Sequence, residues 1–175
     1  MQKKHNTQFP NSPIPQFQII LGIDPGIADT GFGIIKKEAN NKISCLGYGS
    51  IKTPAKTDLS DRLETLSKDL NTIIKKYKPD LVAVEELFFF SNAKTALIVG
   101  QARGVVLLTA KQNKVRIVEF TPLQVKQAVT THGRAEKTQV QRMVKLLLNL
   151  KNIPKPDDAA DALAIAIAAG NSISK

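Results

Sequence analysis

Two acidic residues stand at the ends of apolar runs, and this position restricts how the chain can fold. Asp24 follows the run from Ile19 to Ile23, and Glu85 follows the run from Leu81 to Val84. A carboxylate at the end of a buried element is costly unless a partner neutralises it. The fold must therefore bring both strand ends to a place that a neutralising partner can reach.

Two further acids occur near the end of the chain, in a segment that is otherwise apolar. Asp158 and Asp161 are three residues apart, which places them on one side of the first turn of a predicted helix. Each acid also has an ordinary interpretation, except that Asp161 is hard to explain within so apolar a helix. Asp24 can begin a turn, Glu85 can be an exposed strand end, and Asp157 or Asp158 can cap the helix.

Composition favours a single basic domain. The chain has 175 residues, 42% of them hydrophobic, and 25 Lys and Arg against 15 Asp and Glu, for a net charge of +10. Such a balance favours a polyanion as partner, although a generally basic surface is the simpler alternative. Pro10, Pro13 and Pro15 lie among polar residues, so residues 1–17 are predicted to be a mobile extension and 18–175 one domain.

The cysteine content and the distribution of apolar residues predict the cellular compartment. Cys45 is the only cysteine, which excludes an intrachain disulfide and suits a reducing cytoplasm. The N-terminal residues are polar rather than an apolar signal-peptide core. No segment reads as long and apolar enough to cross a bilayer. We therefore expect a soluble cytoplasmic protein without a membrane partner.

Hydrophobic periodicity predicts an α/β domain with a mixed sheet. Three strands come first, and helices and strands then alternate, which places ligand sites beyond the carboxyl ends of the parallel strands. If the strands ending at Asp24 and Glu85 are neighbours, both acids face one cleft. The predicted strands are 19–24, 30–36, 42–51, 81–85 and 115–120, and the predicted helices are 59–77, 92–111, one opening at Thr121-Pro122, 136–150 and 158–170.

Clustered acids in a basic chain indicate metal-dependent phosphodiester hydrolysis. Two divalent ions about 3.5–4 Å apart can activate water and stabilise charge on the attacking and leaving oxygens. Mg²⁺ prefers carboxylate and water oxygens as ligands. Asp24, Glu85, Asp158 and Asp161 are therefore the candidate catalytic and metal-binding residues.

Six short motifs occur along the chain in a fixed order. In that order they resemble the motifs of RuvC-type Holliday junction resolvases, over about residues 19–170. They are Gly22-Ile23-Asp24-Pro25-Gly26 with Thr30-Gly31, Val84-Glu85-Glu86-Leu87-Phe88, Gly100-Gln101-Ala102-Arg103-Gly104, Gln124-Val125-Lys126, Ala135-Glu136-Lys137, and Asp158-Ala159-Ala160-Asp161-Ala162-Leu163-Ala164.

The resemblance implies a ribonuclease H-like fold, in which a mixed five-stranded sheet is flanked by helices. It further implies a homodimer that cuts two symmetry-related strands of a four-way DNA junction with Mg²⁺, two ions per site, for which Mn²⁺ can substitute. By motif position it assigns the metal to Asp24, Glu85, Asp158 and Asp161. A branch-migration motor complex of the RuvA and RuvB type is the implied partner.

Candidate DNA-binding residues come from the segment leading to the last helix and from the run that follows Glu85. The resemblance places Lys126 and Lys137 near the scissile phosphates, and Arg134 lies in the loop between them. A cation at such a place positions phosphate and offsets negative charge that develops in the transition state. Phe88 begins a run of three phenylalanines and matches the base-stacking position of the family, although one or two of these rings are expected to pack internally.

Some positions depart from the family pattern or stay open. Thr131 stands where we expect a glycine, and the N-terminal extension has no counterpart. His132 can be a phosphate contact, a proton carrier or, as the simpler reading, a solvated loop residue, and Arg103 can support helix packing or a dimer contact.

Three alternative functions can be weighed against this reading. An actin-like or sugar-kinase ATPase would need a second lobe, for which 175 residues leave no room. The second is a related ribonuclease H-like nuclease with a different substrate, over which the Gln101–Gly104 and Gln124–Lys126 motifs favour the junction enzyme. A noncatalytic nucleic-acid-binding protein would gain nothing from clustered acids, because phosphate repels them.

Overall fold

The structure is a computed structural model that describes residues 17–87 and 93–172. Phe88 and nearly all of the predicted N-terminal extension lie outside these ranges. Phe17, which the sequence places at the end of the extension, is the first residue of a strand. Within the described residues, no helix combines the length and apolar character that crossing a bilayer requires.

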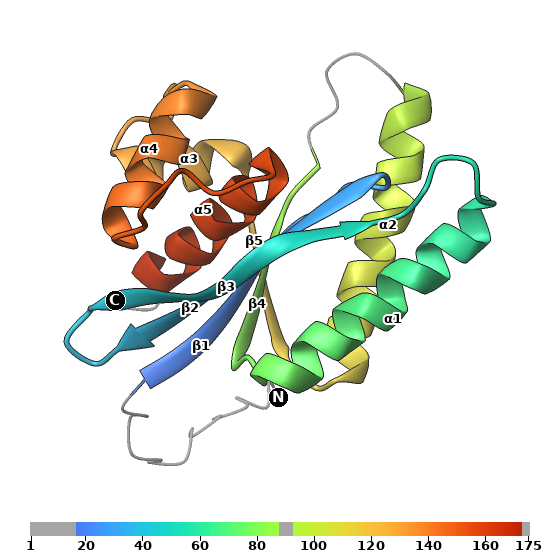
Figure 1. Cartoon of the computed structure of the whole chain (residues 1–175), viewed down its shortest axis with the longest axis horizontal. Helices are drawn as coiled ribbons and strands as arrows, with labels where there is room; N and C mark the ends of the chain where they lie inside the picture. Colours follow the sequence, from blue (N-terminus) through green and yellow to red (C-terminus); the bar gives the residue numbers. More distant parts are fainter. Residues whose placement is uncertain (1–16, 88–92, 173–175) are drawn as a thin grey trace, which may run out of the picture.

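The centre of the fold is a five-stranded mixed sheet, as predicted (Figure 1). Its strand order is β3-β2-β1-β4-β5. Strands β1, β2 and β3 are antiparallel neighbours, whereas β1–β4 and β4–β5 are parallel pairs. The strands are β1 (Phe17–Asp24), β2 (Asp29–Glu38), β3 (Ile43–Lys52), β4 (Leu81–Glu85) and β5 (Arg116–Phe120).

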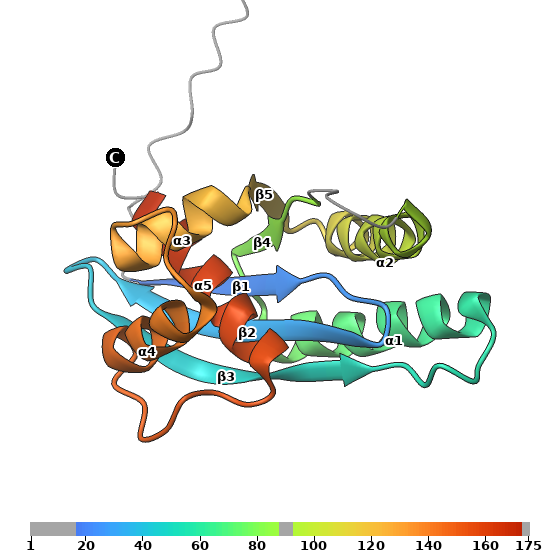
Figure 2. The same ribbon diagram turned by 90° about the horizontal axis from the view of Figure 1, so that it is seen from above.

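Helices cover both faces of the sheet, and a separate hydrophobic cluster fills the space on each side. Helices α1 and α2 pack on one face, while α5 lies on the other with α3 and α4 outside it (Figures 1 and 2). The helices are α1 (Leu59–Tyr77), α2 (Ala93–Gln112), α3 (Pro122–Thr130), α4 (Lys137–Leu147) and α5 (Asp157–Ser172).

Helix boundaries follow local capping signals. Helix α3 begins as predicted: the Thr121 hydroxyl accepts a hydrogen bond from the Gln124 N–H, the Gln124 side chain accepts one from the Thr121 N–H, and Pro122 is the first helical residue. The prediction that α4 continues to Leu150 is wrong. Asn149 has a φ of 50°, and this left-handed residue ends the helix in the place usually taken by glycine.

Helix α5 lies so close to the sheet at Gly22 and Gly31 that no side chain fits at these two positions. A Cβ atom added to Gly22 would lie 2.1 Å from the Ala162 carbonyl oxygen, and one added to Gly31 would lie 2.0 Å from the Asp158 carbonyl oxygen. Gly31 is also the strand partner of Asp24 in the β1–β2 register. The first turn of α5 therefore sits directly over the carboxyl end of β1.

The other end of α5 is fixed by a buried lysine on β2. The side chain of Lys37 is among the few buried charged groups, and its Nζ donates a hydrogen bond to the Gly170 carbonyl. A cation is favourable at a helix C-terminus, where carbonyl groups lack partners. Lys37 and the glycine positions thus fix both ends of α5.

We predict that Gly31→Ala destabilises the protein, because its methyl group would overlap the Asp158 carbonyl. Overpacking of this kind costs about 1–3 kcal/mol, which lowers the Tm by about 2–4 °C per kcal/mol at this chain length. Differential scanning calorimetry measures the change. Gly100→Ala is the control, since its Cβ would meet only Leu87 Cδ1 at 3.8 Å. Equal Tm values for the two variants would show that α5 is not held this close.

Candidate active site

Asp24 and Glu85 reach one cleft because their strands are parallel neighbours. The pairing of β1 with β4 ends at Ile23 and Val84, and the two acids follow directly. Asp161 joins them from the second turn of α5. The cleft has a volume of about 230 Å³ and is lined by Asp24, Glu85, Pro122, Val125, Lys126, Lys137, Val140, Asp161 and Ala164.

Burial and mutual repulsion raise the pKa values of the first two acids. Burial is the main reason that the pKa of Asp24 rises to about 7, and the carboxylates of Glu85, Asp161 and Asp158 raise it further. Burial and Asp161 raise the pKa of Glu85 to about 7 as well, against the opposing effect of Lys126. Burial and the neighbouring acids therefore disfavour the charged form of both carboxylates more than the nearby lysines favour it.

Lys137, the first residue of α4, partly compensates the third acid. Its Nζ lies 2.9 Å from Oδ2 of Asp161 and 3.8 Å from Oδ2 of Asp157. Burial raises the pKa of Asp161, and the hydrogen bond from Lys137 opposes this rise. The same hydrogen bond raises the pKa of Lys137. The ammonium group is thus held at the rim of the cleft.

Asp158 and Asp157 occupy different environments from Asp161. Asp158 is not among the residues lining the cleft, although its charge contributes to the raised pKa of Asp24. Asp157 faces outward and bonds to Lys155 Nζ at 2.7 Å, which lowers the pKa of Asp157. Both belong to the first turn of α5, so the expectation that one of them precedes the helix as its cap is wrong.

The carboxylate oxygens of the cleft are the type of ligand that a hard divalent cation prefers, but their positions do not surround one ion. Carboxylate oxygens are the ligands that Mg²⁺ prefers, and the raised pKa values show negative charge that a cation would compensate. Over residues 17–87 and 93–172, however, no three Asp, Glu, His or Cys side chains are arranged to hold one ion. Lys137 Nζ lies against Asp161 instead.

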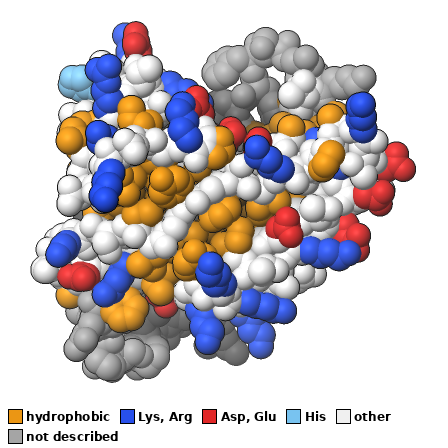
Figure 3. Space-filling model, viewed as in Figure 1, with side chains coloured by type: hydrophobic (Ala, Val, Ile, Leu, Met, Phe, Trp, Pro, Cys, Tyr) orange, Lys and Arg blue, Asp and Glu red, His pale blue; other side chains and the backbone are white. Residues whose placement is uncertain are grey.

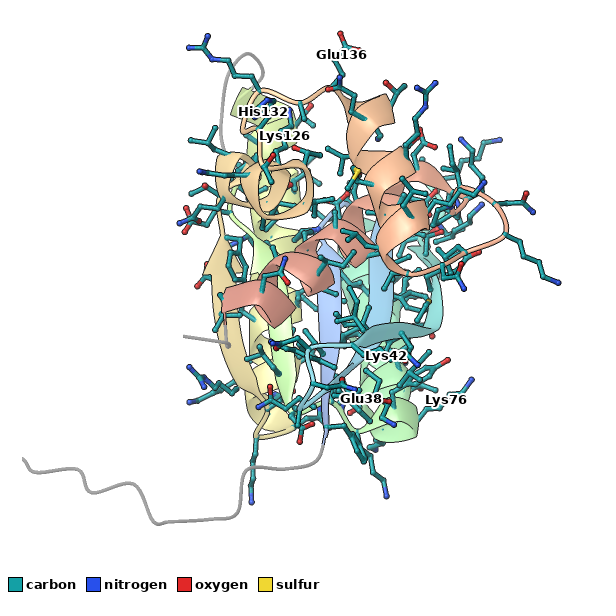
Figure 4. All side chains as sticks on the ribbon, turned by 90° about the vertical axis from the view of Figure 1, so that its left-hand side faces the viewer. Glu38, Lys42, Lys76, Lys126, His132 and Glu136 are labelled. Carbon is teal, nitrogen blue, oxygen red and sulfur yellow. The ribbon has the colours of Figure 1, made fainter. Side chains whose placement is uncertain are left out.

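The predicted DNA-binding cations occupy two places. Lys126 and Lys137 line the cleft, whereas Arg134 borders a separate hollow with Thr131, His132 and Gln139. Figure 4 shows Lys126 on α3 and His132 in the loop that follows it. His132 is exposed.

Thr131 occupies a backbone position that explains why a glycine is expected there. Thr131 ends α3 with a φ of 64°, a left-handed conformation that a β-branched residue rarely adopts and that favours glycine. The Thr130 hydroxyl lies 2.7 Å from the Lys126 carbonyl oxygen and 2.9 Å from that of His132, which braces the loop. The sequence therefore departs from the family pattern at a position where the backbone requires a positive φ.

Two arginines that hold the acidic strand ends were not assigned such roles from sequence. Arg103 Nε on α2 donates to the Glu85 carbonyl at 3.3 Å, and its guanidinium pairs with Glu119 on β5. Arg62 on α1 donates to the Ile27 carbonyl at 3.1 Å, in the turn that follows Asp24. Arg103 thus supports packing within the subunit, one of the two roles left open for it.

Comparisons with known proteins agree on one family. A family model described as crossover junction endodeoxyribonuclease RuvC matches residues 20–169. The chain is 59% identical to the RuvC of Halothermothrix orenii, with 88% of this chain and 93% of that protein covered. The Thermus thermophilus RuvC structure matches with a TM-score of 0.81 and 36% identity, covering 89% of this chain and 95% of that one.

A second Thermus thermophilus structure, RuvC in complex with a Holliday junction substrate, matches with a TM-score of 0.80 and 34% identity over 89% of this chain and 95% of that one. The mixed sheet and the acidic cleft at the ends of β1 and β4 define a nuclease of the ribonuclease H-like class. More narrowly, the chain belongs to the RuvC family of crossover junction endodeoxyribonucleases, hydrolases that resolve Holliday junctions in recombination and repair. The predicted fold class, family and enzyme activity are confirmed.

The raised pKa values predict how stability changes with pH. Between the ordinary pKa values of 3.8 for Asp24 and 4.5 for Glu85 and their folded values near 7, the folded protein binds more protons than the unfolded chain. Stability should therefore fall as pH rises through this window. In a buffer without divalent cations, we expect a lower Tm at about pH 7.5 than at about pH 5.

The double variant Asp24→Asn, Glu85→Gln removes both titrating groups. Its Tm should vary less with pH over the same range and should exceed that of the parent chain near neutral pH. Thermal melts across a pH series measure both. A parent Tm that rises between pH 5 and 7.5 would mean that these acids are ionised at no cost to the fold.

Proposed function

We propose that Asp24, Glu85, Asp158 and Asp161 form the catalytic metal site of this junction resolvase. The observation that carries the proposal is that the half-buried carboxylates of Asp24 and Glu85 line one cleft with Asp161, where burial and neighbouring acids raise both pKa values to about 7. A site that gathers negative charge against its own repulsion is suited to a bound cation. Small rotations of the acidic side chains are then needed to close the ligand set.

Two Mg²⁺ ions, which Mn²⁺ can replace, would supply an activated water and stabilise charge on the phosphate oxygens. The protein residues orient the substrate. Lys126 and Lys137 flank the acids from α3 and α4, so their ammonium groups can hold the phosphates on either side of the bond to be cut. Lys137 can turn from Asp161 toward a phosphate, because its Nζ already lies at the rim.

The substrate in this proposal is the four-way DNA junction, which the Thermus thermophilus relative binds in its complex. The basic net charge of +10 favours binding to the DNA backbone. Arg134 in the α3–α4 loop would contact phosphate next to the cleft. Phe88, which follows Glu85 by three residues, would stack on an unpaired base at the branch point.

The proposal includes a homodimer, since two symmetry-related strands need two active sites. Helix α2 offers a suitable contact surface. Leu97 is 68% exposed and Leu108 is 57% exposed, and with Gln101 and Gly104 they form one stripe at steps of four, three and four residues. Nothing lies within 4 Å of a Cβ added to Gly104, which leaves room for a second helix.

Family membership alone supports two further parts of the proposal. A branch-migration motor complex of the RuvA and RuvB type would deliver the junction, and the cytoplasm would be the compartment. The alternative of a related nuclease differs from this proposal only in the nucleic acid that is cut, so a comparison of substrates separates the two. A noncatalytic binding protein is disfavoured by the acids themselves, because they repel phosphate.

We predict that Asp24→Asn abolishes cleavage of a labelled four-way junction while leaving junction binding largely intact, because the change removes a metal ligand and no phosphate contact. Asp69→Asn, an exposed change on α1, is the control and should cleave normally. Gel assays with Mg²⁺ on junction, linear duplex and RNA–DNA hybrid measure substrate choice. Normal cleavage by Asp24→Asn would overturn the site, and cutting of the hybrid would favour a ribonuclease H.

A second readout is independent of cleavage. Millimolar Mg²⁺ should raise the Tm of the parent chain, because a ligand that binds the folded state stabilises it. The shift should be smaller in Asp24→Asn and unchanged in Asp69→Asn. Equal shifts in all three proteins would place metal binding elsewhere.

We also predict that Leu97→Glu combined with Leu108→Glu yields a monomer, because each change puts a charge into the proposed α2 contact. Sedimentation velocity measures the mass. Leu146→Glu on α4 is a matched control, since Leu146 is 69% exposed and lies away from this stripe. A dimer that survives the double change but not the control change would move the interface to α4.

A further inference from the structure

Two pairs of polar side chains face each other where α4 approaches the start of α5. Lys137 and Gln141 are four residues apart on α4, so they lie on one face of that helix. Asp157 and Asp161 are four apart on α5 and share a face in the same way. Acidic and basic side chains are neighbours on the surface of this region (Figure 3). The two helices thus bring a cation and an amide against two acids.

The ammonium group of Lys137 lies between the two acids but closer to one of them. Its Nζ is 2.9 Å from Oδ2 of Asp161, which is a hydrogen-bond distance. The distance from Nζ to Oδ2 of Asp157 is 3.8 Å, which is too long for a hydrogen bond. Lys137 therefore has one bonded carboxylate and a second one within a short movement of its side chain.

The two oxygens of Asp157 have different surroundings. Oδ1 lies 2.7 Å from Nζ of Lys155, whereas Oδ2 is the oxygen that faces Lys137. Asp157 is not among the residues that line the acidic cleft. It can therefore accept a second cation at Oδ2 while Oδ1 keeps the first, and it does so outside the proposed set of metal ligands.

Gln141 provides a further donor on the same side of Asp157. Its side chain is only 7% exposed, and its Nε2 is buried and makes no hydrogen bond among the described residues. A buried donor without an acceptor is costly. The pKa of Asp157 is lowered chiefly by the hydrogen bond from Lys155, and the Gln141 side chain acts in the same direction. A rotation of Asp157 toward α4 would thus bring its free oxygen to Gln141 and Lys137 together.

The present partner of Lys137 is a residue that the proposed function uses otherwise. Oδ2 of Asp161 holds the ammonium group in this structure, yet Asp161 is one of the proposed metal ligands. When Asp161 turns to a divalent cation, Lys137 loses its partner, and its positive charge then opposes the charge of the cation. A carboxylate outside the ligand set would reduce this cost and keep the ammonium group at the rim of the cleft.

We propose that Asp157 is a positioning residue, which receives the Lys137 ammonium group when Asp161 becomes a metal ligand. This inference rests on the proposed function of the acidic cleft. The simpler alternative is that Asp157 is a solvated acid at a helix start, where negative charge is favourable in any case. The two differ in whether Asp157 affects metal binding through Lys137.

A double-mutant cycle tests the proposal without measuring cleavage. The Tm at increasing Mg²⁺ concentration gives the apparent Kd for Mg²⁺. Asp157→Asn should weaken Mg²⁺ binding about threefold, as expected from one exposed ion pair. In the Lys137→Ala background the same change should have no effect, because the ammonium group that Asp157 receives is absent. Asp69→Asn, which removes an exposed charge on α1, is the control and should bind Mg²⁺ as the parent chain does.

The remaining outcomes separate this inference from its alternatives. Equal weakening by Asp157→Asn in both backgrounds would overturn it, because Asp157 would then act on the metal through its charge alone. An unchanged Kd in Asp157→Asn would overturn it as well. So would weaker Mg²⁺ binding in Lys155→Ala, which would trace the effect to the pair of Asp157 with Lys155.

Failure of the proposed metal site has a different signature. Mg²⁺ would then raise the Tm of Asp24→Asn as much as that of the parent chain, whichever residue stands at position 157, and the role of Asp157 would fall with the site. If the shift is lost in Asp24→Asn but Asp157→Asn acts equally in both backgrounds, the metal site stands and only the role of Asp157 is wrong.

Discussion

The contact between helix α5 and the sheet is the constraint on which the rest of the structure depends. The helix backbone can approach β1 and β2 this closely only because Gly22 and Gly31 have no side chains. From Ala162 to Gly170 every residue of α5 is buried, so the apolar interior fixes the helix along its length. This packing fixes the first turn of α5 above the end of β1, where Asp24 lies.

This packing allows the protein to hold like charges together. Acids that repel one another would separate if they lay on mobile loops, but here Asp24 and Asp161 are attached to buried elements. The start of a helix also offers partial positive charge to nearby carboxylates. Lys137 lowers the pKa of Asp24 and Lys126 lowers that of Glu85, but burial and the neighbouring acids leave both pKa values raised. The fold thus holds more carboxylates than lysines around this cleft, an arrangement suited to cation binding.

Much of the architecture could be predicted from sequence because it rests on local signals. Apolar periodicity gave the order of strands and helices, and Thr121-Pro122 predicted the start of α3. The acids Asp24 and Glu85 were predicted to share a cleft, and they do. What escaped prediction depends on neighbours distant in sequence. The roles of Gly31 against α5, of Arg103 at the Glu85 carbonyl and of Lys137 at Asp161 become visible only when separate elements are in place.

The burial of α5 has a consequence for the motions of the enzyme. Backbone groups in the most enclosed element exchange their hydrogens only when the whole domain opens, whereas edge strands and exposed helices open in smaller fluctuations. Asp158 and Asp161 belong to that enclosed element, and β3 lies at the edge of the sheet. The protein can therefore yield at its periphery, as binding a branched substrate requires, while two of its acids keep their spacing until the domain itself unfolds.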